Sequence, residues 1–116
     1  MGQRTVKVID AYFEITRGAE AKALLKLGFD KPRELEEALA AGGWALHRGP
    51  DGTIDDIDYT AAVFSPDFNA FLPQLGAFVT ANSFIVLEDE ELLQCRWDFD
   101  GAKCTFLDFG LARNAG

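Results

Sequence analysis

The segment from Leu93 to Phe106 constrains the fold of this chain more than any other. Its first part alternates strictly, with apolar Leu93, Cys95, Trp97 and Phe99 interleaved with polar Gln94, Arg96, Asp98 and Asp100. A period of two is typical of a strand with one buried and one solvated face. Asp100-Gly101 follows, and this dipeptide favours a two-residue type I′ turn. The segment therefore predicts an antiparallel hairpin, and with it a sheet that buries one face.

A two-residue loop also predicts the register of this hairpin. The expected pairs are Phe99 with Ala102, Asp98 with Lys103, Trp97 with Cys104, Arg96 with Thr105 and Cys95 with Phe106. In this register Cys95 and Cys104 are diagonal neighbours about 7–8 Å apart, which is beyond normal disulfide reach. We therefore expect two reduced thiols on the core side of the sheet.

Two further segments have strand composition. Residues 83–87, Ser-Phe-Ile-Val-Leu, are mostly apolar, and they reach the hairpin through the acidic turn 88–91, which predicts a three-strand antiparallel meander. Residues 5–15 alternate in the same way and favour a strand, although Val6, Ile9 and Phe13 also lie at helical spacing. The middle segment 44–59 predicts a separate hairpin around a turn at residues 49–52.

Helix signals occupy the remaining segments. Thr16 can cap a helix that ends near Gly28, with Ala21, Leu24, Leu25 and Gly28 on one face. Pro32 predicts the start of a second helix that ends at residues 42–43. Residues 65–67, Ser-Pro-Asp, predict the start of a third, whose apolar stripe runs to residue 79 and which Pro73 kinks or divides in two.

Together these patterns predict a single α+β domain over residues 1–116. Its core would be an antiparallel sheet containing the C-terminal meander, packed on one face by three or four helices. The chain has 116 residues, of which 48% are hydrophobic, so it can bury one proper core. Exposed strand edges would allow either a monomer or an edge-strand homodimer.

Acidic residues are concentrated in the second half of the chain. From Gly49 onward twelve Asp or Glu stand against three Lys or Arg, a formal charge of −9, whereas the first 48 residues carry +1. The candidate binding residues lie in three turn regions: Asp55, Asp56 and Asp58; Glu88, Asp89, Glu90 and Glu91; Asp98 and Asp100. Such a field attracts basic proteins and repels phosphate backbones and acidic membranes. We therefore expect a basic protein partner, no nucleic acid and no membrane. The alternative is that the acidic turns serve only to keep the protein soluble.

Residue sets for familiar chemistry are missing from the sequence. His47 is the single histidine, which leaves the usual nucleophile–base pairs unsupplied. There is no C-x-x-C pair, and the aspartates at 51–58 alternate with isoleucines where a calcium loop needs oxygens. Neither a P-loop nor a G-x-G-x-x-G motif occurs. We expect no catalytic residue, no metal and no cofactor, and hence a protein that is not an enzyme.

Three function classes follow. The first is a non-enzymatic binding protein, similar in logic to an immunity protein, antidote or inhibitor, whose acidic half engages a basic partner. The second is a small-molecule-binding domain or an enzyme of unknown class, with a pocket lined by Trp44, Tyr59, Arg96 and Trp97. The third is a regulator, because the element order over 19–59 resembles a winged helix-turn-helix.

The N-terminus carries charges at positions 4, 7 and 10 and has no continuous apolar run. That composition argues against a secretory signal and favours a cytoplasmic protein.

Overall fold

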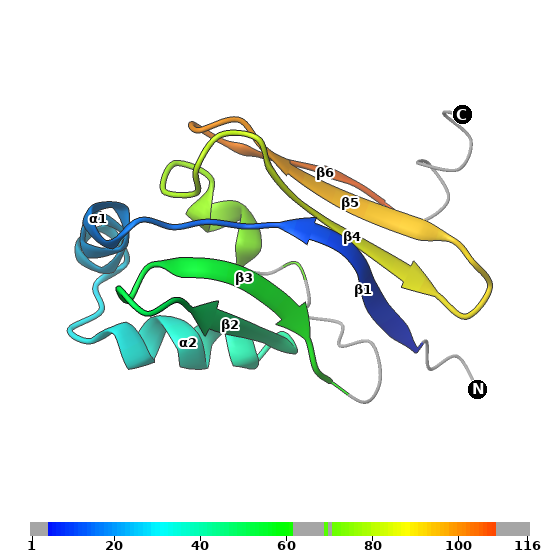
Figure 1. The fold of residues 1–116 in the computed structure, drawn as a ribbon, viewed down its shortest axis with the longest axis horizontal. Helices are drawn as coiled ribbons and strands as arrows, with labels where there is room; N and C mark the ends of the chain where they lie inside the picture. Colours follow the sequence, from blue (N-terminus) through cyan, green and yellow to red (C-terminus); the bar gives the residue numbers. More distant parts are fainter. Residues whose placement is uncertain (1–4, 62–68, 70, 109–116) are drawn as a thin grey trace.

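The computed structural model of the protein describes residues 5–61, 69 and 71–108. The elements in chain order are β1 (Val6–Tyr12), α1 (Arg17–Leu27), α2 (Pro32–Ala40), β2 (Trp44–Arg48), β3 (Ile54–Tyr59), the 3₁₀-helix η1 (Leu72–Leu75), β4 (Ser83–Asp89), β5 (Gln94–Phe99) and β6 (Cys104–Leu107). The strands form a four-stranded antiparallel sheet in the order β1-β4-β5-β6 and a separate β2-β3 hairpin (Figure 1). The fold is therefore mixed α and β with an antiparallel sheet, as the sequence predicts.

The expected number of helices was wrong. The described residues contain two α-helices and one short 3₁₀-helix, not three or four helices. The predicted helix start at 65–67 lies outside the described residues, and η1 is the only helical part between 71 and 79. Pro73 has no N–H to donate. The backbone around it forms the hydrogen bonds of a 3₁₀-helix, which join residues three apart, such as Gln74 N to Phe71 O at 3.0 Å.

The strand prediction for residues 5–15 is confirmed over β1, which pairs with β4, and the meander β4-β5-β6 is also confirmed. The register of the last hairpin differs from the prediction. Phe99 faces Cys104 and Trp97 faces Phe106, so the loop has four residues and not two. The reason is Asp100, whose Oδ1 accepts hydrogen bonds from the backbone N of Ala102 and Lys103 at 2.9 and 2.8 Å. This side chain closes a wider turn.

A shift of two residues along β6 leaves each side chain on its predicted face, because the side-chain period of a strand is two. It places Cys104 opposite Phe99, farther from Cys95 than expected, and both cysteines are reduced.

Helix α1 begins at the Thr16 cap, whose Oγ1 accepts from Ala19 N at 3.2 Å, and ends at Gly28, which has a φ of +78°. The apolar face read from the sequence is only partly buried. Glu20 and Ala23 are the buried residues and Leu24 packs against the core, while Leu25 is exposed. Helix α2 begins at Pro32 as predicted and lies along β2 (Figure 1).

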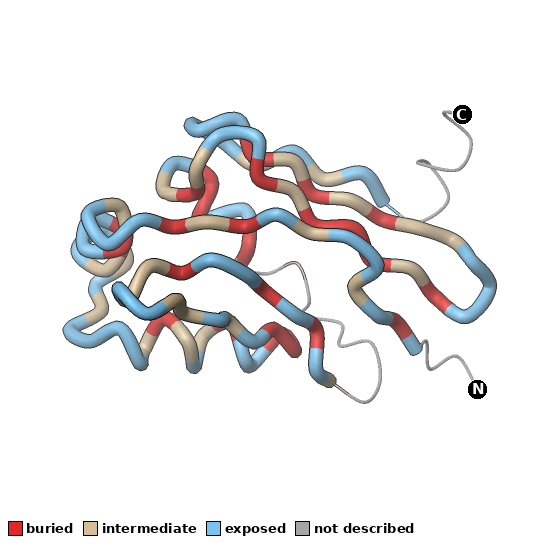
Figure 2. Tube along the Cα trace, in the orientation of Figure 1, coloured by how far each residue is buried: buried red, intermediate tan, exposed pale blue. Residues whose placement is uncertain are grey.

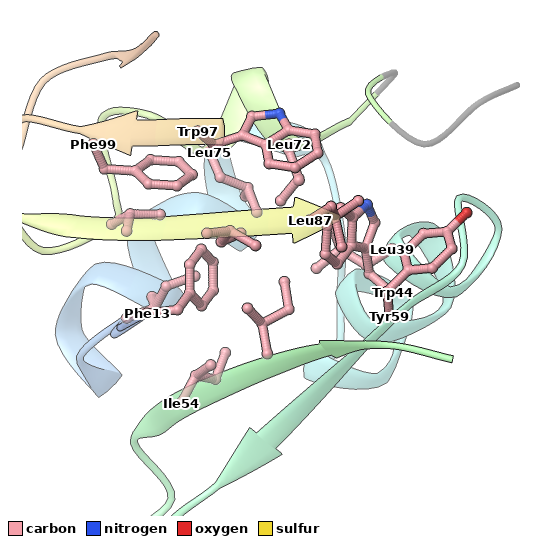
Figure 3. Close-up of a cluster of buried hydrophobic side chains, with 14 of the residues drawn as sticks. Phe13, Leu39, Trp44, Ile54, Tyr59, Leu72, Leu75, Leu87, Trp97 and Phe99 are labelled. Carbon is pink, nitrogen blue, oxygen red and sulfur yellow. The ribbon is translucent and has the colours of Figure 1, made fainter. Parts of the chain in front are cut away.

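A single hydrophobic cluster joins the hairpin to the four-stranded sheet. Ile15 and Ile54 exchange backbone hydrogen bonds of 2.9 and 3.1 Å and so connect the end of the N-terminal strand segment to β3. Deeper in the core, Trp44 of β2 meets Trp97 of β5 edge-on, with ring centroids 5.2 Å apart (Figure 3). Along β5, buried positions alternate with partly buried ones (Figure 2). Helix α2 packs along β2, and the four-stranded sheet uses one face for this core.

None of the helices within the described ranges combines the length and apolar character that a bilayer crossing requires.

Candidate functional site

The candidate site is the outward face of the β2-β3 hairpin, formed by His47, Asp55, Asp56 and Asp58. Strand β3 points Ile54, Ile57 and Tyr59 into the core, so its carboxylates face solvent. A β-bulge between His47 and Arg48 accommodates the extra residue and lets both Asp55 and Asp56 reach the surface. We call these four residues the hairpin face.

An imidazole lies within this carboxylate row. His47 Nδ1 is 2.6 Å from Asp55 Oδ1, and His47 stands directly opposite Asp56 in the strand register. The hydrogen bond that His47 donates to Asp55, followed by the negative charge of that carboxylate, raises the pKa of His47 above its usual value. Asp58 lies opposite Ala45, so no base faces it across the ladder. The hairpin face is therefore strongly anionic once His47 has lost its proton.

The hairpin is fastened to both helices by Arg48, which the sequence analysis did not single out. Its guanidinium binds Glu20 of α1 through two hydrogen bonds of 2.6 and 2.8 Å. It also donates to Glu36 of α2 at 2.8 Å and to the carbonyl of Gly52 at 3.0 Å. The hydrogen bond to Glu20 is the main cause that raises the pKa of Arg48, and the bond to Glu36 adds to it. No local pattern in the sequence marks this pair, because Glu20 and Arg48 are 28 residues apart.

The turn at the end of the hairpin is also held by a carboxylate. Asp51 accepts hydrogen bonds from the N and Oγ1 of Thr53 at 3.0 and 3.1 Å, and these bonds lower the pKa of Asp51. Arg48 and this turn thus both hold the turn end of the hairpin, while Asp56 and Asp58 accept hydrogen bonds from the backbone N of Ile57 and Tyr59, each at 2.8 Å. The hairpin face is a preformed surface.

The predicted acids at 88–91 lie elsewhere, in the turn between β4 and β5. Asp89 is buried, and its Oδ1 accepts from the backbone N of Glu91 and Leu93, both at 2.9 Å. This carboxylate closes the turn and does not reach the surface. Glu88 accepts from Gln94 Nε2 at 3.1 Å, while Glu90 and Glu91 are exposed.

Asp98 and Asp100 belong to the opposite end of β5. Asp98 accepts from Arg96 Nε through both oxygens, at 2.9 and 3.0 Å. Asp100 closes the β5-β6 turn, and the backbone N–H groups of Lys103 and then Ala102 lower its pKa. The three predicted acidic groups therefore lie in three separate places, and the structure brings together Asp55, Asp56 and Asp58 with His47.

The four residues of the alternative ligand pocket do not line a common cavity. Trp44, Tyr59 and Trp97 are buried core residues whose rings pack edge-on against one another, at 4.9 and 5.2 Å between centroids. Arg96 points to the other side of the sheet, where its guanidinium lies 4.7 Å from the centre of the Phe84 ring.

Groups suited to metal binding or nucleophilic chemistry are also separated. Within the described residues, no three His, Cys, Asp or Glu side chains are grouped to hold a metal ion. Burial, followed by the charge of Asp98, raises the pKa of the Cys104 thiol to about 11, so this thiol is protonated at neutral pH.

No known protein family, curated protein or solved structure matches this chain. Any functional argument therefore rests on the geometry of its own residues.

Proposed function

We propose that the protein is a small acidic binding protein that engages a basic protein partner through the hairpin face. The observation that carries the proposal is the row Asp55, Asp56 and Asp58, which the β3 register presents to solvent beside a single imidazole. An immunity protein, an antidote or an inhibitor of a basic protein works by this logic, because opposite fields accelerate encounter and cover a positively charged site.

Two further features support a binding role. The carboxylates stand on a hairpin fastened by Arg48 to both helices, so little conformational freedom is lost on association. The net charge of −8 extends the attraction beyond the contact surface. Helix α2 carries Glu34, Glu36 and Glu37 against Arg33, which makes it a poor surface to lay beside phosphates and gives no support to the regulator alternative.

The test begins with capture of partners from an extract of the producing cells on immobilised wild-type protein and on D55N/D56N/D58N. A captured protein is identified, purified and titrated between about 50 and about 300 mM NaCl. We expect its association rate to fall with salt and to be about tenfold or more slower with the triple variant at low salt. The matched control is E88Q/E90Q/E91Q, which removes three charges from the β4-β5 turn and should leave most of the rate intact.

Affinity that is indifferent to ionic strength would contradict the proposal. Equal loss of rate in both triple variants would show that bulk charge, and not the hairpin face, drives association.

A further inference from the structure

His47 is the group of the hairpin face whose charge changes within the ordinary pH range. It is the single histidine of the chain, and its side chain is 70% exposed. An imidazole titrates near pH 6.5, whereas a surface carboxylate of ordinary acidity stays ionised above about pH 5. The three aspartates give the hairpin face a formal charge of −3, and a proton on His47 changes this charge to −2. The strength of the face therefore depends on one proton.

The strand register places the imidazole among the carboxylates. His47 faces Asp56 across the ladder, and the β-bulge brings Asp55 Oδ1 to 2.6 Å from His47 Nδ1. Arg48, the next residue of β2, points away from His47 because side chains alternate along a strand. The charged group of α2 nearest in this network, Glu36, is bound to Arg48. The charges that act on His47 are therefore those of Asp55 and, next, Asp56.

The hydrogen bond to Asp55 also decides which nitrogen of His47 exchanges its proton. Nδ1 donates to Asp55, and within the described residues Nε2 has no hydrogen-bond partner. The proton that is gained and lost is thus the one on Nε2, which faces solvent. Because the pKa of His47 is raised above 6.5, at least about a quarter of the free protein carries this proton at pH 7.

We propose that a basic partner releases the Nε2 proton of His47 when it binds the hairpin face, so that acidification weakens the complex. This inference rests on the function proposed above and adds a regulator to the same site. In the step, the Nε2–H bond of the imidazolium breaks, its electron pair stays on the nitrogen, and the proton passes to water. The cause is repulsion between the imidazolium and the Lys or Arg side chains of the partner, which neutral imidazole does not exert.

The size of the effect follows from Coulomb's law. Residues directly opposite in an antiparallel pair are about 5 Å apart, so a base that contacts Asp56 lies roughly 6–7 Å from the imidazole. At this distance the repulsion of two unit charges in water corresponds to about a threefold change in Kd. Linkage is reciprocal, so the factor by which the proton weakens partner binding equals the factor by which the partner weakens proton binding.

A titration with hexaarginine tests the proposal, because this peptide with both termini blocked carries a charge that does not change with pH. Amide shifts of the full chain are followed by NMR at about pH 5.5 and about pH 8.5, in about 20 mM NaCl. We expect the Kd of the wild type to be about threefold higher at the lower pH. The pKa of His47, followed on its ring protons, should fall on binding by the logarithm of the same factor.

Two variants fix the charge at this position. His47→Gln is neutral at both pH values and should bind each time as tightly as the wild type at the higher pH. His47→Lys is charged at both and should bind each time as weakly as the wild type at the lower pH. Both replace a side chain that is 70% exposed, so neither should disturb the fold.

The possible results separate this inference from the function on which it rests. Hexaarginine that shifts the amides of residues 55–58 with the same Kd at both pH values would overturn the inference and leave the hairpin face as the binding surface. A pH difference that persists in His47→Gln, or a His47 pKa that binding leaves unchanged, would overturn it in the same way. Absence of shifts at residues 55–58 at the higher pH would contradict both proposals.

Discussion

Arg48→Met should cost the protein a large part of its stability. Arg48 donates two hydrogen bonds to Glu20, one to Glu36 and one to the Gly52 carbonyl. The Glu20 side chain is only 8% exposed, so the variant would leave a carboxylate buried without its counter-ion. Removal of one partner from a buried pair costs about 3–5 kcal/mol.

Solvent access sets the expected value within that range. The Arg48 side chain is 27% exposed and Glu36 is 42% exposed, so water screens part of the network. We therefore expect a loss near the lower end, about 3 kcal/mol. For 116 residues an unfolding entropy of about 2.1 cal/mol/K per residue converts this loss into a fall in Tm of about 12 °C.

Urea unfolding followed by the fluorescence of the buried Trp44 and Trp97 measures the effect. Glu36→Gln is the exposed control and should cost about 1 kcal/mol or less. The double variant E20M/R48M should recover much of the loss, because both charges are gone and apolar side chains occupy their place. A loss below about 1 kcal/mol for Arg48→Met, or a double variant no more stable than this single one, would refute the reasoning.

Three further predictions concern other parts of the fold. Gly76→Ala should lower the free energy of unfolding by about 1–3 kcal/mol, because the new Cβ would lie 2.6 Å from the backbone N of Cys104. The control is Gly18→Ala, whose new Cβ meets nothing within 4 Å and which should show no such loss in the same urea titration. The pKa of His47, followed by NMR as the only imidazole, should lie above its usual value and return toward it in Asp55→Asn. Because the pKa of His47 is raised in the folded protein, the small stabilisation from the His47–Asp55 pair is present below about pH 6.5 and is lost as pH rises through the folded pKa. A His47 pKa that Asp55→Asn leaves unchanged would contradict the pairing. With a pKa of about 11, Cys104 should react slowly with a thiol reagent at about pH 8, and rapid modification of the folded protein would show that the thiol is more accessible than the structure has it.

Local patterns predicted the parts of the fold that local energetics decide. Strict alternation in β5 defined which side chains are buried, and it kept them on the correct face even though the predicted register was two residues off. The Thr16 cap, Pro32 and Gly28 marked helix ends because each of these residues acts on the backbone within a few positions. The acidic excess was readable in the same way, since charge is a property of composition.

Tertiary structure decided which of those acids form a surface. Asp55, Asp56 and Asp58 share the hairpin face because they belong to one strand, whereas Asp89 and Asp100 are used to close turns. No spacing rule distinguishes a carboxylate that closes a turn from one that stands exposed along a strand. The difference depends on where the neighbouring N–H groups lie after folding.

The sequence by itself determined the strand content, the helix ends and the anionic character of this protein. Only the folded chain decided that α1 buries Glu20 and exposes Leu25, because the partner that makes this possible, Arg48, lies 28 residues away. The pairing of β1 with β4, which places Asp10 and Arg96 on either side of Val86, likewise joins segments about 75 residues apart. Such contacts form between distant segments, and a local pattern carries no information about which segment will face it.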